Sequence, residues 1–176
     1  HFRLACTQCI RWNSNWDKEK AILMKEENEP KLYAEFLKYS KNVLSKLDKN
    51  SYEICGMLWV QGEADSNKIE NTKLPSIAYQ ENLSNLITKV RQDFRKPQLP
   101  FLLFQVGFGD VVKGMKTVAK NDDDVILIPQ SEVKSSEFYF EQNEPPIWHY
   151  TTKSMKKIGE YFFQFYQDNF TKNINP

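Results

Sequence analysis

The residues best suited to chemistry lie together in the segment 58–65, which reads LWVQGEAD. Gln61 has a side-chain NH2 that can donate a hydrogen bond to an oxyanion. Gly62 lets the backbone approach a ligand closely, and Glu63 can accept a hydrogen bond from an imidazole. Asp65 adds a second carboxylate. This composition fits an active-site loop and also fits a plain turn with solvated acids, and the spacing alone favours neither.

A second candidate is His149, which together with the terminal His1 makes up the histidines of the chain. It directly precedes a segment with helical periodicity, where a loop can hold a general base at the edge of a sheet. A single histidine is more often structural than catalytic. The sequence pattern therefore leaves both roles of His149 open.

Short apolar runs alternate with segments of helical spacing along the chain. The runs predict strands over residues 2–6, 54–60, 101–106 and 125–128, and the spacing predicts helices over 33–47, 79–94, 111–120 and 151–170. The uninterrupted run 54–60 is typical of a strand covered on both faces. This alternation predicts an α/β fold, a three-layer sandwich with a mostly parallel sheet flanked by helices.

Ligands of such sheets bind beyond the carboxyl ends of the strands. We therefore expect chemistry just after Cys6, Val60, Val106 and Ile128, and near the start of the last helix. Both candidate segments, 58–65 and His149, meet this expectation.

Length and composition predict one domain over residues 1–176. The 24 basic and 23 acidic residues give a net charge of +1, and the lysines are scattered. We therefore expect no nucleic-acid partner and no membrane partner. Oligomeric state and localisation stay open.

The three cysteines, Cys6, Cys9 and Cys55, are an odd number and cannot form a complete disulfide framework. Cys6 and Cys9 have the spacing of a redox motif or half a zinc site, but no second pair completes a tetrahedral zinc site. We interpret them as ordinary cysteines and expect no metal.

A family resemblance is carried by four stretches, GMLWVQGEADS, AYQENLSNLITKVRQDF, LPFLLFQV and WHYTTKSMKKIGEYF. They resemble the carbohydrate-esterase branch of the SGNH hydrolases, which includes acetyl xylan esterases of carbohydrate esterase family six and sialate O-acetylesterases. Residues 59–65 match its W-x-QGE-(S/A)-(D/N) block, and His149 and Tyr150 match its closing histidine block. The resemblance runs from Phe2 to Tyr166 and implies a flavodoxin-like SGNH fold.

The resemblance also implies a reaction, the removal of acetyl groups from acetylated sugars of the acetyl xylan or sialic acid type. In the family a serine attacks the acetyl carbonyl, a histidine acts as its base, and an acid orients the histidine. Matched positions make His149 the base, Gln61 the oxyanion donor and Glu63 the orienting acid, with Asp65 as a weaker choice for the acid. The resemblance implies an acetylated carbohydrate substrate, no cofactor, and a secreted or extracellular location.

Three departures from the family pattern stand out. The Gly-x-Ser-Asn nucleophile block has no counterpart, so we expect the serine and the first strand to lie upstream of His1. The family's Gly-Gly-(T/S) run is replaced by the residues 6–9, CTQC. Pro146 occupies the position of an aspartate three residues before the histidine, which leaves Glu63 as the acid of any triad. An absent first strand would leave an unpaired sheet edge and an exposed apolar face.

Other serines near the predicted edge are Ser14, Ser66 and Ser131, and none follows a strand-to-helix elbow that would expose a nucleophile. Removing the nucleophile of such a site lowers turnover by roughly 10⁶-fold. The 176-residue chain is therefore expected to be nearly inactive by itself.

Several aromatic residues are candidates for sugar stacking, because a sugar ring has an apolar C–H face and a polar rim. Trp12, Trp16 and Tyr150 are predicted to contact substrate, as are Gly62 and Asp65. Trp59 is better explained as part of the core.

Two alternatives remain beside the acetylesterase. A catalytically inactive pseudoenzyme or carbohydrate-binding domain would keep the scaffold without the chemistry, and Pro146 and the residues 6–9 favour it. A lipase or thioesterase would need an apolar acyl groove, and the QGE block disfavours it.

Overall fold

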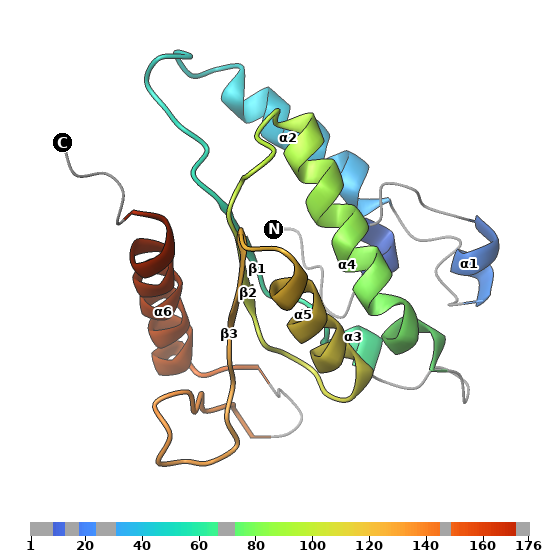
Figure 1. The fold of residues 1–176 in the computed structure, drawn as a ribbon, viewed down its shortest axis with the longest axis vertical. Coiled ribbons are helices and arrows are strands. Elements are labelled where there is room, and N and C mark those ends of the chain that lie inside the picture. Colours follow the sequence, from blue (N-terminus) through green and yellow to red (C-terminus); the bar gives the residue numbers. More distant parts are fainter. Residues whose placement is uncertain (1–8, 13–17, 24–30, 67–72, 145–148, 172–176) are drawn as a thin grey trace.

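A parallel three-stranded sheet lies at the centre of the computed structural model, which describes residues 9–12, 18–23, 31–66, 73–144 and 149–171. Its strands are β1 (Met57–Trp59), β2 (Phe101–Phe104) and β3 (Val125–Ile128), in the order β1-β2-β3. Both strand pairs are parallel, as Figure 1 shows. The predicted strand 2–6 lies outside the described residues.

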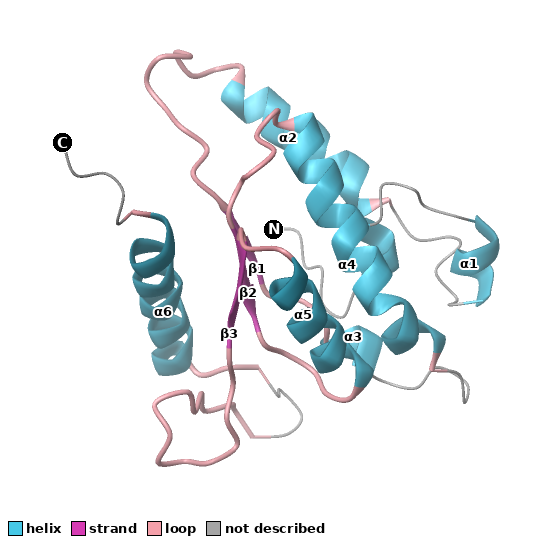
Figure 2. Cartoon of the chain, viewed as in Figure 1, coloured by secondary structure: helices cyan, strands magenta, loops and turns pink. Residues whose placement is uncertain are grey.

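Helices cover both faces of this sheet (Figures 1 and 2). One layer contains α2 (Leu32–Leu44), α4 (Leu74–Asp93) and α5 (Asp110–Asn121), and α6 (Thr152–Phe170) covers the opposite face. Short helices complete the described elements: η1 (Cys9–Trp12), α1 (Lys18–Leu23) and α3 (Glu63–Ser66). The three-layer α/β sandwich predicted from the sequence is confirmed.

The core forms around β2, whose four residues are all fully buried. Such a strand needs apolar side chains on both faces, which explains the sequence FLLF. Phe104 contacts Phe140 edge-on at a centroid distance of 4.9 Å and packs on Phe162 of α6. β2 therefore carries the packing that joins the two helical layers.

The strand β1 differs from its prediction in length and burial. It spans three residues instead of the predicted seven, and Leu58 is 58% exposed. Leu58 pairs with Leu102 in register and so points to the face that α6 covers. The helix α6 packs mainly on β2 and β3, so it leaves Leu58 uncovered. The prediction of a strand covered on both faces was wrong for this reason.

Each of the four predicted helices is present, as α2, α4, α5 and α6, and differs from its prediction mainly at the ends, whereas η1, α1 and α3 were not predicted. α4 begins five residues earlier than predicted, because Pro75 in its first turn is compatible with a helix start. α6 begins after Thr151, whose hydroxyl oxygen accepts a hydrogen bond from the backbone N–H of Ser154 at 3.2 Å. Among the described residues, no helix is long and apolar enough to cross a membrane.

The exposed strand β1 generates a test of self-association. We expect the chain to associate with rising concentration through β1, because among the described residues no strand pairs with its outer edge, and an open apolar edge is a template for another strand. Leu58→Lys should reduce this association, measured by sedimentation equilibrium. The control is Ile77→Lys on α4, since Ile77 is 63% exposed but lies on a helix. Equal association of both variants and the unmodified chain would contradict the expectation.

Candidate functional site

The backbone that follows β1 is fixed by two buried aromatic side chains. The hydroxyl of Tyr79 donates a hydrogen bond to the carbonyl oxygen of Gln61 at 2.6 Å. The same hydroxyl accepts a hydrogen bond from the indole Nε1 of Trp59 at 3.3 Å. Burial raises the pKa of Tyr79 well above its ordinary value, so the hydroxyl keeps its proton. The start of the QGE loop is therefore held from the core side.

Asp65 is a buried carboxylate that ties this loop to η1. Asp65 is only 1% exposed. Both carboxylate oxygens accept from the backbone N–H of Cys9, at 3.0 and 2.9 Å. Oδ2 also accepts from the side-chain Nε2 of Gln61 at 2.6 Å. Asp65, predicted as a substrate contact and as a weaker choice for the acid, here positions the Gln61 amide.

Gly62 is required by the packing of α5 against the loop. Its φ angle is 154°, which side chains of L-residues rarely allow. A Cβ atom at this position would lie 2.9 Å from Val111 Cγ1 and 3.1 Å from Met115 Cε. We predicted that Gly62 would let a ligand come close to the backbone. In the structure, the side chains of Val111 and Met115 from α5 take up that space.

Ser66 joins the end of α3 to the loop between β2 and α5. Its hydroxyl donates to the carbonyl oxygen of Gly62 at 3.0 Å and accepts from the backbone N–H of Phe108 at 2.9 Å. The buried Ser66 hydroxyl therefore links two loops at the carboxyl edge. Ser131 accepts from the backbone N–H of Val133 at 3.1 Å, and Ser14 lies outside the described residues.

His149 is held by the chain segment that runs antiparallel to it. The backbone N–H of Asn143 donates to the carbonyl oxygen of His149 at 2.8 Å, and the Asn143 side-chain amide donates to the same oxygen at 2.9 Å. The backbone N–H of Thr151 donates a hydrogen bond to the backbone carbonyl oxygen of Glu141 at 3.0 Å. These bonds fix the backbone of His149 directly before α6, and its side chain is exposed.

Tyr150 connects the histidine segment with the ends of two strands. Its hydroxyl donates to Oε1 of Gln130, after β3, at 2.9 Å. Burial and the negative charge of Glu63 raise the pKa of Tyr150 to about 12. Tyr150 also packs edge-on against Phe104, the last residue of β2, at a centroid distance of 5.7 Å, so the segment before α6 lies at the carboxyl edge of the sheet. Glu63 follows β1, whose carboxyl end is at the same edge. Glu63 and His149 are both exposed there.

The tryptophans that were predicted to contact substrate are not all placed by the structure. Trp12 packs edge-on against Trp59 at a centroid distance of 5.2 Å and also contacts Phe36. This packing places Trp12 beside the core, where Trp59 is buried as predicted. Trp16 lies outside the described residues, as does Pro146.

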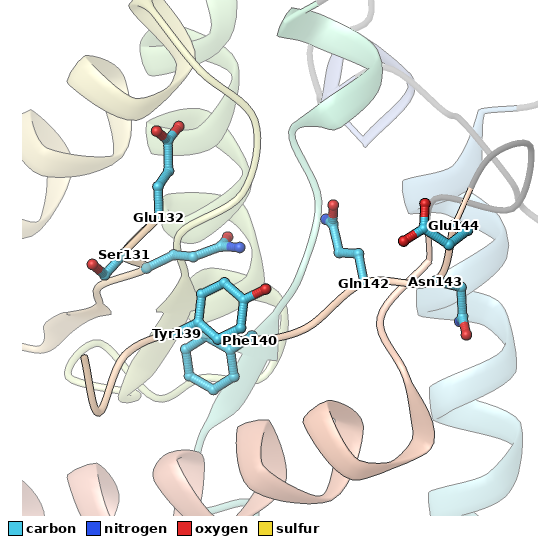
Figure 3. Close-up of a pocket in the computed structure, with 8 residues that line it drawn as sticks. Ser131, Glu132, Tyr139, Phe140, Gln142, Asn143 and Glu144 are labelled. Atoms are coloured by element: carbon cyan, nitrogen blue, oxygen red, sulfur yellow. The ribbon is translucent and has the colours of Figure 1, made fainter. Parts of the chain in front are cut away.

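A cavity of about 290 Å³ lies where the chain leaves β3 (Figure 3). It is next to Tyr150, whose hydroxyl donates to the lining residue Gln130. Its lining comes from the segments on either side of a turn: Gln130, Ser131, Glu132, Tyr139, Phe140, Gln142, Asn143 and Glu144. Sequence reasoning named Ser131 alone among them. The available signal was the position of Gln130, a polar residue two places after a buried strand.

The described residues show no metal-binding geometry. In this part of the chain, no group of three or more His, Cys, Asp or Glu side chains is placed to hold a metal ion. Cys9 is a free, buried cysteine, and burial together with Asp65 raises the pKa of its thiol well above the ordinary value. The thiol of Cys9 therefore stays protonated and unreactive.

A comparison with protein families gives one match that spans nearly all of these features. The family described as "Carbohydrate esterase, sialic acid-specific acetylesterase" matches residues 7–168. The chain belongs to this family. The resemblance to sialate O-acetylesterases is confirmed, and the match includes the QGE loop and His149.

The fold of this carbohydrate esterase family member is also found in a solved structure. The X-ray structure of a protein from Arabidopsis thaliana at 1.6 Å resolution has a TM-score of 0.66 and 22% sequence identity to the chain. The match covers 93% of this chain and 58% of the Arabidopsis protein, so the chain spans little more than half of that protein. This structural match supports the SGNH-like fold. A comparison with curated proteins finds no match.

The packing of Gly62 generates a prediction about stability. Gly62→Ala should lower the free energy of unfolding by roughly 1–3 kcal/mol, because the new Cβ meets α5 and the φ angle is unfavourable. Chemical denaturation measures the change. Gly159→Ala on α6 is the matched control, since no atom lies within 4 Å of its added Cβ. If the Gly62→Ala variant were as stable as this control, the prediction would be wrong, because α5 would then be able to shift away from the added Cβ atom.

The bonds of Ser66 generate a prediction that separates structure from catalysis. Ser66→Ala should lower the free energy of unfolding by roughly 1–3 kcal/mol, because the Gly62 carbonyl and the Phe108 N–H lose their partner. The rate of hydrolysis of a small aryl acetate should stay within about twofold of the rate without the substitution. A loss on the order of 10³-fold or more in turnover, with folded protein, would identify Ser66 as the nucleophile instead.

Proposed function

We propose that this chain is the larger part of a carbohydrate O-acetylesterase that removes acetyl groups from acetylated sugars. The observation that carries the proposal is the position of the segment before α6 at the carboxyl edge of a parallel sheet, where Tyr150 packs edge-on against Phe104 of β2 and bonds to Gln130 after β3. Glu63 follows β1 and so comes to the same edge. Membership of a carbohydrate esterase family supports the same chemistry. Ligands of parallel sheets bind at this edge.

The proposed reaction is acyl transfer through a serine. The serine oxygen attacks the acetyl carbonyl carbon while His149 takes the serine proton, and His149 then gives this proton to the departing sugar oxygen. A water molecule then attacks the acetyl-serine carbonyl carbon while His149 takes its proton, and His149 returns this proton to the serine oxygen as the bond to the acetyl group breaks and acetate leaves. Glu63 is the proposed acid that orients the imidazole and stabilises its protonated form.

Gln61 is the proposed donor to the oxyanion formed in each step. Its amide is oriented by the 2.6 Å bond to Asp65, and its backbone is held by Tyr79. A donor fixed in advance stabilises developing charge without reorganising during the reaction. Asp65 and Tyr79 thereby support the proposed role of Gln61 without contacting substrate.

We propose that the nucleophile lies outside the described residues of this chain. Ser66 and Ser131 are engaged in hydrogen bonds to backbone groups. Neither follows a strand directly, which is where a nucleophile elbow exposes its serine. A serine that precedes His1 in the gene product is the proposed nucleophile.

The position of the apolar groove favours a sugar over a long acyl chain. The groove holds about 450 Å³ and is lined by α2, α4 and the residues 54, 56, 57 and 58. It therefore lies at the amino-terminal end of β1, away from His149. The polar cavity beside Tyr150 lies at the carboxyl edge instead. This arrangement favours an acetylated sugar over a lipid or thioester substrate.

The test is hydrolysis of a small aryl acetate and of acetylated xylan by the 176-residue chain and by the full-length gene product. We expect activity in the full-length protein, a loss on the order of 10³-fold or more with His149→Ala, and near absence of activity in the 176-residue chain. Glu63→Gln should lower kcat by a smaller factor, of roughly 10- to 10⁴-fold.

The matched control for Glu63→Gln is Glu35→Gln, because Glu35 is an exposed acid on α2. It should leave kcat unchanged. A folded full-length protein that hydrolyses neither acetate would refute the esterase and support the pseudoenzyme or carbohydrate-binding domain. Activity that survives His149→Ala would remove His149 from the mechanism.

A further inference from the structure

The position of an exposed imidazole is set by the backbone that carries it. The side chain of His149 is exposed, so close packing against neighbouring side chains does not fix it. A general base must lie within about 0.5 Å of its productive position, because a shift of about 1 Å costs on the order of 10²-fold in rate. The residues that hold the segment around His149 therefore decide how well it can act as a base.

Tyr150, directly after His149, ties this segment to the sheet. Its ring packs edge-on against Phe104 at a centroid distance of 5.7 Å, and Phe104 is fully buried at the end of β2. Its hydroxyl donates to Oε1 of Gln130, two residues after β3, at 2.9 Å. One side chain thus contacts the carboxyl ends of two neighbouring strands.

Gln130 is itself fixed to the sheet. Its backbone carbonyl oxygen accepts a hydrogen bond from the side-chain Nε2 of Gln105 at 3.2 Å. The backbone N–H of Gln105, directly after β2, donates to the carbonyl oxygen of Ile128 at 2.9 Å. The amide of Gln130 therefore offers the Tyr150 hydroxyl an acceptor whose place is set by both strands.

The main chain of the histidine segment is paired with residues 141–143. Gln142 and Tyr150 form an antiparallel bridge, and Asn143 donates to the carbonyl oxygen of His149 from its backbone N–H at 2.8 Å and from its side chain at 2.9 Å. Figure 3 shows Gln142 and Asn143 on the chain that follows Phe140. Residues 141–143 are all exposed, so the anchor of the paired segments to the buried sheet is the Tyr150 side chain.

The same contacts bear on the prediction that Tyr150 contacts substrate. Its ring and its hydroxyl both have partners within the protein. Burial, together with the charge of Glu63, raises the pKa of Tyr150 to about 12, so the hydroxyl keeps its proton and stays a donor to Gln130. These observations favour a role in holding the segment over a contact with substrate.

We propose that Tyr150 is a positioning residue for His149, which it holds at the carboxyl edge of the sheet through the bond to Gln130 and the ring contact with Phe104. The inference rests on the proposed function, because it assigns the residue that places the proposed base. Tyr150 acts through His149 and takes no part in the bond changes of the reaction. Gln130, which sequence reasoning missed, is the second member of this anchor.

The kinetic test is Tyr150→Phe in the full-length gene product, because this change removes the hydroxyl and keeps the ring. With a small aryl acetate, we expect kcat to fall by roughly 10- to 100-fold. KM should stay within about twofold, since His149 acts in both halves of the proposed reaction and both halves slow together. A rise in KM at unchanged kcat would make Tyr150 a substrate contact and overturn the positioning role.

The matched control is Tyr161→Phe, which also removes one tyrosine hydroxyl. That hydroxyl donates to the carbonyl oxygen of Glu137 at 3.1 Å, and Tyr161 lies in the middle of α6, more than two turns after its start. The control should leave kcat unchanged. An equal loss of kcat in both variants would show a general effect of losing a hydroxyl bond and would overturn the proposal.

A double variant tests whether the hydroxyl acts through Gln130. Gln130→Leu removes the acceptor and should lower kcat by itself. Added to Tyr150→Phe, it should lower kcat by no more than about a further twofold, because the two residues share one bond. Losses that multiply in the double variant would show that the two residues act separately, and would overturn the anchor.

Amide hydrogen exchange in the 176-residue chain tests the anchor without any activity. The backbone N–H groups of Asn143 and Thr151 pair the two segments, so NMR can follow their exchange. In Tyr150→Phe they should exchange roughly three- to tenfold faster, the effect of one lost hydrogen bond, and in Tyr161→Phe they should not change. Unchanged exchange in Tyr150→Phe would overturn the anchor.

Failure of this inference can be told apart from failure of the proposed function. An unmodified protein that hydrolyses no acetate refutes the esterase, and with it the base that Tyr150 would position. Hydrolysis with the same kcat in Tyr150→Phe keeps the esterase and overturns the positioning role.

Discussion

The arrangement of the proposed site depends on the hydrogen bonds that the Asp65 carboxylate accepts. This carboxylate is buried and accepts hydrogen bonds from the Cys9 backbone and the Gln61 side chain. A buried charge is tolerated only when such bonds compensate its loss of water. Removing any partner would leave part of this charge uncompensated, so η1, the QGE loop and α3 are held in one geometry.

The proposed site lies where separate segments converge on the carboxyl edge of the sheet. Glu63 is the first residue of α3, which follows β1, while Gln130 follows β3 and His149 precedes α6. The short antiparallel pairing of 141–143 with 149–151 brings the last of these segments into place. Rigid supports thus surround exposed side chains, an arrangement that suits a reaction in which substrate arrives from solvent.

Much of the fold was predictable because its signals are local. The strand 125–128 and the helix beginning at Thr151 follow directly from an apolar run and from helical spacing with a capping threonine. The QGE loop and His149 were found because they stand beside such elements. The exposure of Leu58 could not be found in this way, since it depends on how far α6 extends over the sheet.

The sequence by itself determined the alternation of elements, the family, and the residue types available for chemistry, because periodicity and motifs are properties of neighbouring residues. The tertiary structure decided which polar residues support the site and which face it. Asp65 and Ser66 turned inward to bond with Cys9 and Phe108, partners 56 and 42 residues away. The cavity around Tyr139 likewise exists only where the segments 130–132 and 139–144 meet, and no local pattern encodes that contact.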